Sequence, residues 1–131
     1  MSCLISVFCK IDFPLLTVKS TIEESLYIQL LERATGDNEI VLSGENNGIL
    51  VTAFKQNLLV DDSGIEFTKY NLEIDIENFH SDEPPIESGM NLAKNITEKH
   101  NCETIVVRNL QVLLQRYCPA TVDQALPGDD R

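Results

Sequence analysis

Two segments far apart in the chain alternate between apolar and polar residues, and this pattern limits the possible folds more than any other feature. Residues 3 to 13 place apolar side chains at the odd positions, whereas Leu4 and Phe8 partly cover the opposite face. Residues 65 to 77 also alternate, and from Tyr70 onward the apolar side chains lie at even positions. A period of two is typical of a strand with one buried face. The chain is therefore expected to form a sheet that packs one side against other elements.

Two other segments have helical spacing. Ser20-Thr21-Ile22-Glu23 matches a capping box, and the apolar stripe behind it runs to Gly36, which predicts a helix over about residues 20 to 35. Pro84-Pro85 suits the first turn of a second helix, and Asn101 follows basic residues that favour the end of this helix.

Short β-rich runs complete the pattern. Residues 39 to 43 and 49 to 55 flank a Gly- and Asn-rich loop, which predicts a hairpin. Residues 104 to 108 predict a core strand. Residues 109 to 117 fit either a helix or a strand, and we favour a short C-terminal helix. The expected order is β-α-β-β-β-α-β, an α+β fold with a mainly antiparallel sheet of about five strands and two main helices on one face.

The length sets the expected number of domains. At 131 residues the chain is near the usual size of one domain, and two halves would each bury too little surface. We expect a single α+β domain over residues 1–118 and a loosely ordered tail over residues 119–131.

The net charge is the unusual part of the composition. The chain has 21 acidic residues against 10 basic ones, which gives a net charge of −11. Phosphate contacts need Lys and Arg, so neither nucleic acid nor an anionic membrane is the expected direct partner. No apolar run approaches the ~20 residues of a spanning helix, and no secretion signal is recognisable. We expect a cytoplasmic protein with reduced cysteines.

Few residues offer catalytic chemistry. His80 is expected in a loop beside Ser81 and Asp82, but adjacency in sequence does not build a catalytic triad. His100 is expected in the last turn of a helix, and its pairing with Cys102 as nucleophile and base is the alternative. The four cysteines have neither a C-x-x-C pair nor the spacing of a zinc site. We therefore expect no enzyme, no metal and no cofactor.

The acidic residues are concentrated between residues 61 and 87. This segment holds nine acids and one base, and so carries −8 of the net charge. The strand pattern places Glu73, Asp75 and Glu77 on one outward face, at intervals of about 6.5–7 Å. Like charges so close repel one another, and spreading them over the surface would serve solubility equally well. We therefore interpret the segment as a binding surface.

This surface is expected to bind a basic protein. A protein interface usually needs a buried anchor beside its charges, and Phe79 is the nearest aromatic residue that the strand pattern does not place in the core. The expected contact residues are Asp61, Asp62, Glu66, Glu73, Asp75, Glu77 and Phe79, with Asp82, Glu83 and Glu87 at the rim.

A small acidic α+β chain without catalytic residues resembles the immunity proteins that bacteria make against their own nuclease toxins, including those of contact-dependent growth inhibition systems. The resemblance is one of overall profile, and it implies one-to-one neutralisation of a toxin domain. Two alternatives stay open. One is a structural or adaptor protein that forms oligomers and uses its charge for solubility, and the other is a small hydrolase that uses Cys118 or His80.

Overall fold

The computed structural model describes residues 4–34, 39–55, 69–80, 83–109 and 112–119. In chain order the elements are β1 (Leu4–Cys9), the 3-10 helix η1 (Leu15–Val18), α1 (Lys19–Leu26), β2 (Leu31–Ala34), β3 (Ile40–Asn46), β4 (Ile49–Lys55), β5 (Leu72–Asn78), α2 (Ile86–His100), β6 (Thr104–Arg108) and β7 (Val112–Tyr117). The predicted α+β class and its two main helices are confirmed, whereas the described residues form seven strands where about five were expected. The predicted single domain and its C-terminal tail stay predictions, because residues 120–131 lie outside the described part of the chain.

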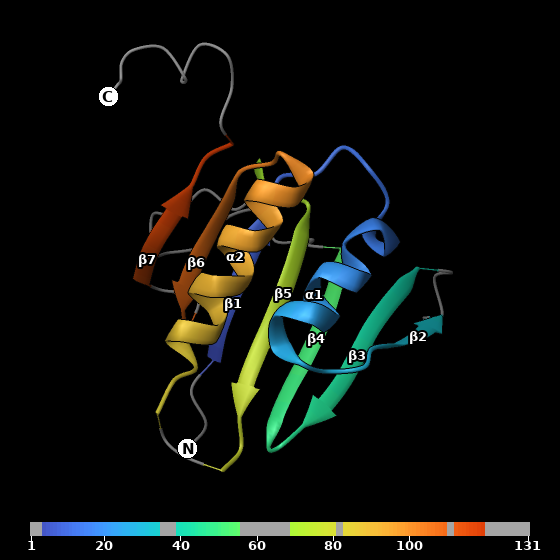
Figure 1. Cartoon of the computed structure of the whole chain (residues 1–131), viewed down its shortest axis with the longest axis vertical. Coiled ribbons are helices and arrows are strands. Elements are labelled where there is room, and N and C mark those ends of the chain that lie inside the picture. The colour runs from blue at the N-terminus through green and yellow to red at the C-terminus, as the bar shows by residue number, and fades with distance from the viewer. Residues whose placement is uncertain (1–3, 35–38, 56–68, 81–82, 110–111, 120–131) are drawn as a thin grey trace.

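The strands form one sheet in the order β2-β3-β4-β5-β1-β6-β7, and every neighbouring pair is antiparallel. The helices lie on one face of this sheet, where α2 packs over β1 and β6 and α1 lies beside α2 (Figure 1). Both alternating segments of the sequence become central strands, since β5 and β1 are neighbours in the middle of the sheet. No helix in the described part of the chain is long and apolar enough to cross a membrane.

The main core lies between the sheet and the helices. It contains, among others, Ile5, Val7, Cys9, Ile22, Leu72, Ile74, Ile76, Leu92 and Ile96. Helix α2 approaches β1 closely at Gly89, where an added Cβ would lie 2.6 Å from Cγ2 of Ile5. The period-two pattern therefore arises because every second side chain of the central strands faces the helices.

A second buried cluster lies on the other face of the sheet. It consists of Phe8, Tyr70, Ile105 and Val107, none more than 3% exposed. Phe8 alternates with the core residues of β1 and lies opposite Ile105 of β6. Tyr70 was expected on the helix-covered face, but it precedes β5 and packs in this second cluster, where its hydroxyl donates a hydrogen bond to Glu103. The sheet is therefore apolar on both faces near β1 and β6.

The first helix is shorter than predicted. It ends after Leu26 because Tyr27 takes the left-handed conformation, with φ of 53°. No side-chain cap forms at its start, which follows directly from η1, and Glu23 does not act as a capping-box residue. The Glu23 carboxylate instead accepts a hydrogen bond from the Leu30 backbone N–H at 2.9 Å and pairs with Lys19 at 3.2 Å. The predicted helix stop at Gly36 lies outside the described residues.

The predicted hairpin of β3 and β4 is confirmed, with a tighter turn than expected. Asn47 and Gly48 both have positive φ, 53° and 83°, as the two central residues of a type I′ turn require. Gly44 and Asn46 pair within β3 and do not belong to the loop.

Residues 112 to 117 form the strand β7, so the favoured C-terminal helix was wrong. The β6–β7 register shifts between Val106 and Val107, and Leu114 is left out of the ladder pairs. This bulge lets Leu114 and Tyr117 both pack against the main core, although they are three positions apart. A bulged strand thus reproduces the spacing of a helix face.

Both edges of the sheet carry features that oppose the addition of another strand. β2 has only four residues, all exposed, with Glu32 and Arg33 at its centre. β7 carries the bulge at Leu114 and an exposed arginine, Arg116. Short, charged or bulged edges resist edge-to-edge pairing. Binding by side chains is therefore a better expectation for this chain than binding by strand addition.

Candidate functional site

The structure describes six of the ten predicted contact residues. Glu73, Asp75 and Glu77 lie along β5, Phe79 follows this strand, and Glu83 and Glu87 lie at the start of α2. The other four, Asp61, Asp62, Glu66 and Asp82, lie outside the described residues.

The expectation of a solvent-facing strand of three carboxylates is wrong for Glu73. Because β5 has neighbours on both sides, Glu73 lies between Phe54 of β4 and Phe8 of β1, and it is only 5% exposed. Its burial raises the pKa of Glu73 to about 9, and the hydrogen bond to Asp75 and the charge of Asp75 act in the same direction. Glu73 is therefore protonated at neutral pH and contributes no charge to a docking surface.

Asp75 is also engaged inside the protein. It is half-buried, and its Oδ1 accepts a hydrogen bond from the hydroxyl of Ser6 at 2.7 Å. Ser6 is fully buried, so this hydroxyl cannot reach a substrate. Glu73, Asp75 and Ser6 thus form a polar cluster within the sheet, and the burial of Ser6 argues against a nucleophilic or acid–base role.

The end of β5, the β3–β4 turn and the start of α2 lie at the same end of the sheet (Figure 1), and their sequences carry several carboxylates and one exposed aromatic residue. We call this surface the acidic end, and it comprises Glu45, Glu77, Phe79, Glu83 and Glu87. Glu45 and Glu77 lie in one row across the sheet, with Leu50 of β4 between them, which separates them by about 10 Å. The sequence alone did not identify Glu45 as part of this surface, because its position depends on the register of the hairpin.

Phe79 is the most exposed apolar side chain of the acidic end, at 54%. Its backbone is held in place, since its N–H donates a hydrogen bond to the Gly48 carbonyl at 2.8 Å. The ring of His80 packs against Gly48, where an added Cβ would lie 2.6 Å from the imidazole. The loop after β5 therefore presents Phe79 from a fixed position, and its role as an anchor stays a prediction.

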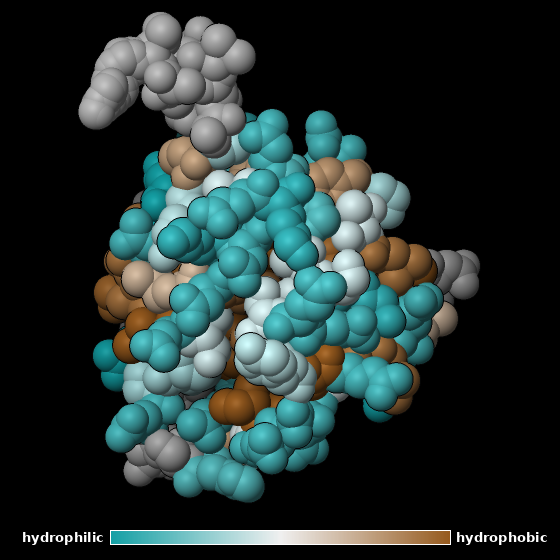
Figure 2. All heavy atoms as spheres, in the orientation of Figure 1, coloured by the Kyte–Doolittle hydropathy of each residue, from teal (hydrophilic) through white to brown (hydrophobic). Residues whose placement is uncertain are grey.

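The charges are distributed unevenly along the strands. Glu83 and Glu87 are exposed at the acidic end. Arg108, the last residue of β6, is a basic residue at the same end. Lys10 and Lys55 lie just beyond β1 and at the end of β4, on the opposite end of the sheet. Acids such as Glu39 and Glu103 also lie at that end, so its charge is mixed, whereas the acidic end is mainly negative. The outer surface of the two helices is mainly hydrophilic (Figure 2).

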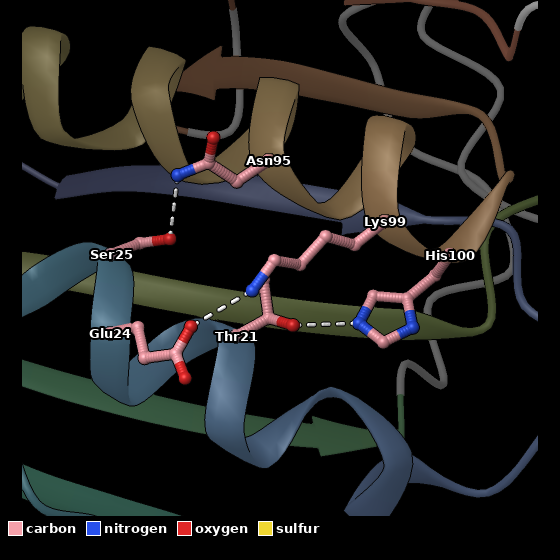
Figure 3. A network of polar contacts seen from close by, with 6 residues as sticks. All are labelled: Thr21, Glu24, Ser25, Asn95, Lys99 and His100. Atoms are coloured by element: carbon pink, nitrogen blue, oxygen red, sulfur yellow. Dashed lines mark hydrogen bonds and ion pairs between the residues drawn. The ribbon is translucent and has the colours of Figure 1, made fainter.

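A network of polar contacts joins α1 to α2 (Figure 3). Its three links are Thr21 Oγ1 to His100 Nε2 at 2.7 Å, Glu24 to Lys99 at 2.8 Å, and Asn95 Nδ2 to Ser25 Oγ at 2.8 Å. Burial lowers the pKa of His100, and the nearby charge of Lys99 lowers it further. The Thr21–His100 distance suits a nucleophile and its base, but Thr21 is only 2% exposed. We interpret the network as a link between the helices.

The cysteine chemistry considered from the sequence has little geometric support. Cys9 and Cys102 are buried, and burial raises the pKa of both thiols, that of Cys102 to about 11. Cys102 therefore stays protonated beside His100 at neutral pH. Cys118 is exposed, and Cys3 lies outside the described residues. Within the described ranges, no three His, Cys, Asp or Glu side chains come together as a metal site would require.

Comparison with known proteins adds no assignment: no family model, curated protein or solved structure matches this chain.

Proposed function

We propose that this chain is a binding protein that neutralises a basic protein partner through the acidic end. The observation that carries the proposal is the position of Phe79, which is exposed, is fixed by its backbone and lies at the same end of the sheet as Glu45 and Glu77. The class of partner that we propose is a bacterial toxin domain with nuclease activity, which would make this chain an immunity protein.

The composition of the acidic end suits such an interface. Protein interfaces are dominated by a few central aromatic or arginine anchors, with charged residues at the rim. Phe79 supplies the anchor, while Glu45, Glu77, Glu83 and Glu87 supply the rim. Rim charges accelerate encounter with an oppositely charged partner more than they strengthen the final complex.

A nuclease active site is a suitable partner because it must hold phosphates in a basic cleft. Carboxylates about 10 Å apart on a rigid sheet end can occupy such a cleft in place of phosphates. The buried Glu73 and the internally bonded Asp75 are left out of this contact surface. The remaining acids of the segment, Asp61, Asp62, Glu66 and Asp82, stay predicted contributors.

A second function, self-association as a structural protein, is favoured by a different feature. Val112 and Leu113 on the edge strand β7 are 53% and 42% exposed, and hydrophobic atoms reach the surface along this edge (Figure 2). An interface built on these residues would be apolar and insensitive to salt. The bulge in β7 weakens this alternative.

Replacing Phe79 by alanine tests the proposal. The partner to test is the basic C-terminal domain of a large exported protein, where the gene immediately upstream encodes one. We expect the native chain to bind this domain and to block its nuclease activity, and Phe79→Ala to raise the dissociation constant at least thirtyfold, which corresponds to about 2 kcal/mol for a central anchor. Calorimetric titration measures the constant.

Leu16→Ala is the control, because Leu16 is an apolar side chain that is 39% exposed in η1, at the end of the sheet opposite to the acidic end. It should leave binding unchanged. If both variants bind as the native chain does, Phe79 is not the anchor and the acidic end is not the interface.

A further inference from the structure

An apolar cavity of about 420 Å³ opens at the end of the sheet opposite to the acidic end. It lies under η1, between the segment that follows β1 and the neighbouring ends of β3, β4 and β5. Its apolar walls are Ile11, Phe13, Leu15, Leu16, Ile40 and Leu72. Small-molecule sites in proteins have volumes of about 300–1,000 Å³ and mostly apolar linings. In Figure 2 hydrophobic atoms reach the surface near η1 and the first residues of β3.

The walls of this cavity are held apart by specific contacts. Asn71 clamps the segment after β1, since its Oδ1 accepts from the Ile11 N–H at 2.8 Å and its Nδ2 donates to the Ile11 carbonyl at 2.7 Å. The Phe13 ring packs against the His100 ring at a tilt of 39°, with ring centroids 5.6 Å apart, and His100 is hydrogen-bonded to Thr21. These two contacts fix the backbone of Ile11 and the ring of Phe13 at the wall of the cavity. The cavity is therefore preformed, which reduces the cost of binding a ligand.

The polar groups of the lining define what kind of ligand fits. The amide of Asn71 is already used in the clamp, and Glu39 already has an interaction partner. Lys55 is exposed at the end of β4, and no ion pair of Lys55 is found among the described residues. An ammonium group beside an apolar cavity complements a molecule with an apolar body and one negative charge.

We propose that this cavity binds a medium-chain monocarboxylic acid, with the hydrocarbon tail between η1 and the sheet and the carboxylate at Lys55. The site is separate from the acidic end and does not depend on the function proposed for that surface. A single anionic headgroup suits Lys55, and Glu39 in the same lining disfavours ligands with a second negative charge.

A series of straight-chain acids tests the proposal on the whole protein. Hexanoate, octanoate and decanoate are titrated below the concentrations at which they form micelles, and methyl shifts of isoleucine and leucine are followed by NMR. Each added methylene should tighten binding about fourfold, because burying one contributes about 0.8 kcal/mol. The saturable shifts should be confined to Ile11, Leu15, Leu16, Ile40 and Leu72. Decanol should bind more weakly than decanoate.

Two variants separate the headgroup from the tail. Lys55→Met should weaken the binding of decanoate by up to about fivefold, as expected for an exposed ion pair, and leave the binding of decanol unchanged. Lys94→Met, at an exposed position on α2, is the control and should change the binding of neither ligand. Leu16→Trp should abolish binding of both, since Leu16 is 39% exposed at the cavity and can take a larger ring without disturbing the core.

Three results would overturn the proposal. One is the absence of saturable shifts with decanoate, and another is binding whose strength does not change with chain length. The third is a set of shifts that Leu16→Trp leaves intact, which would place the acid elsewhere on the surface.

Discussion

Phe8→Ala is expected to lower the free energy of unfolding by about 3–5 kcal/mol, the usual loss when a buried phenylalanine is truncated. Phe8 is completely buried, although it points away from the helices that cover the main core. Its loss would leave a cavity against Ile105 and Val107. Urea unfolding, followed by circular dichroism, measures the change as a lower midpoint with an unchanged slope.

Phe79→Ala is the internal control for this experiment, because Phe79 is more than half exposed and its truncation should change stability by less than about 1 kcal/mol. If Phe8→Ala does not fold, the smaller change Phe8→Leu still allows the loss of unfolding free energy at Phe8 to be compared with that at Phe79. A loss at Phe8 no larger than that at Phe79 would mean that this face of the sheet is open to solvent.

Glu73→Gln is expected to stabilise the protein at pH 8 by at least about 1 kcal/mol, the equivalent of about one unit of pKa. In the unfolded chain Glu73 loses its proton near its ordinary pKa of 4.5, whereas in the folded state burial raises the pKa to about 9. Between these values the folded state binds more protons, so native stability falls as pH rises. Glutamine keeps the size and the hydrogen-bonding capacity but cannot ionise.

The measurement is the free energy of unfolding of both proteins from pH 4 to pH 9. The two curves should meet near pH 4.5 and diverge as pH rises, with the variant the more stable. Glu83→Gln, at an exposed position, should follow the wild-type curve. Parallel curves for wild type and Glu73→Gln would show that Glu73 is charged in the folded protein.

Five of the strands, β1, β3, β4, β5 and β6, and the second helix were predictable because local pattern decides them. The two alternating segments give β1 and β5, and the Gly- and Asn-rich loop gives the hairpin. The first helix was overestimated because its apolar stripe continues into Ile28 and Leu30, which stay buried after the helix has ended at Tyr27. The strand β7 was missed because a bulge mimics helical spacing. Bulges and helix ends depend on tertiary contacts that periodicity does not report.

The candidate site was only partly predictable for a related reason. Alternation correctly placed Glu73 and Asp75 on the face away from the helices, but it could not reveal that this face is buried around Phe8 and Glu73. Phe8 was the available signal, since an aromatic residue on a supposedly polar face indicates a second apolar layer. Phe79 and Glu87 were placed correctly at the surface, because they lie at the ends of elements and not within the sheet.

The burial of Glu73 changes where the acidic charge can act. A carboxyl group that is protonated at neutral pH and bonded to its neighbour does not attract a partner. In the described part of the segment, the exposed carboxylates are Glu83 and Glu87, and Glu77 is half-buried near the end of β5. A partner is therefore expected to meet the end of the sheet and not its face.

The most direct test of the acidic end as an interface is the association rate constant with the proposed partner, a basic nuclease domain, measured by stopped flow from about 0.05 to 0.5 M salt. We predict a fall of about tenfold or more over this range, because opposite charges accelerate encounter. The double variant Glu83→Lys/Glu87→Lys should make the association rate constant depend less on salt, whereas Glu73→Gln should leave its salt dependence unchanged. A rate constant that does not change with salt, or that changes equally in all these variants, would contradict the proposed interface.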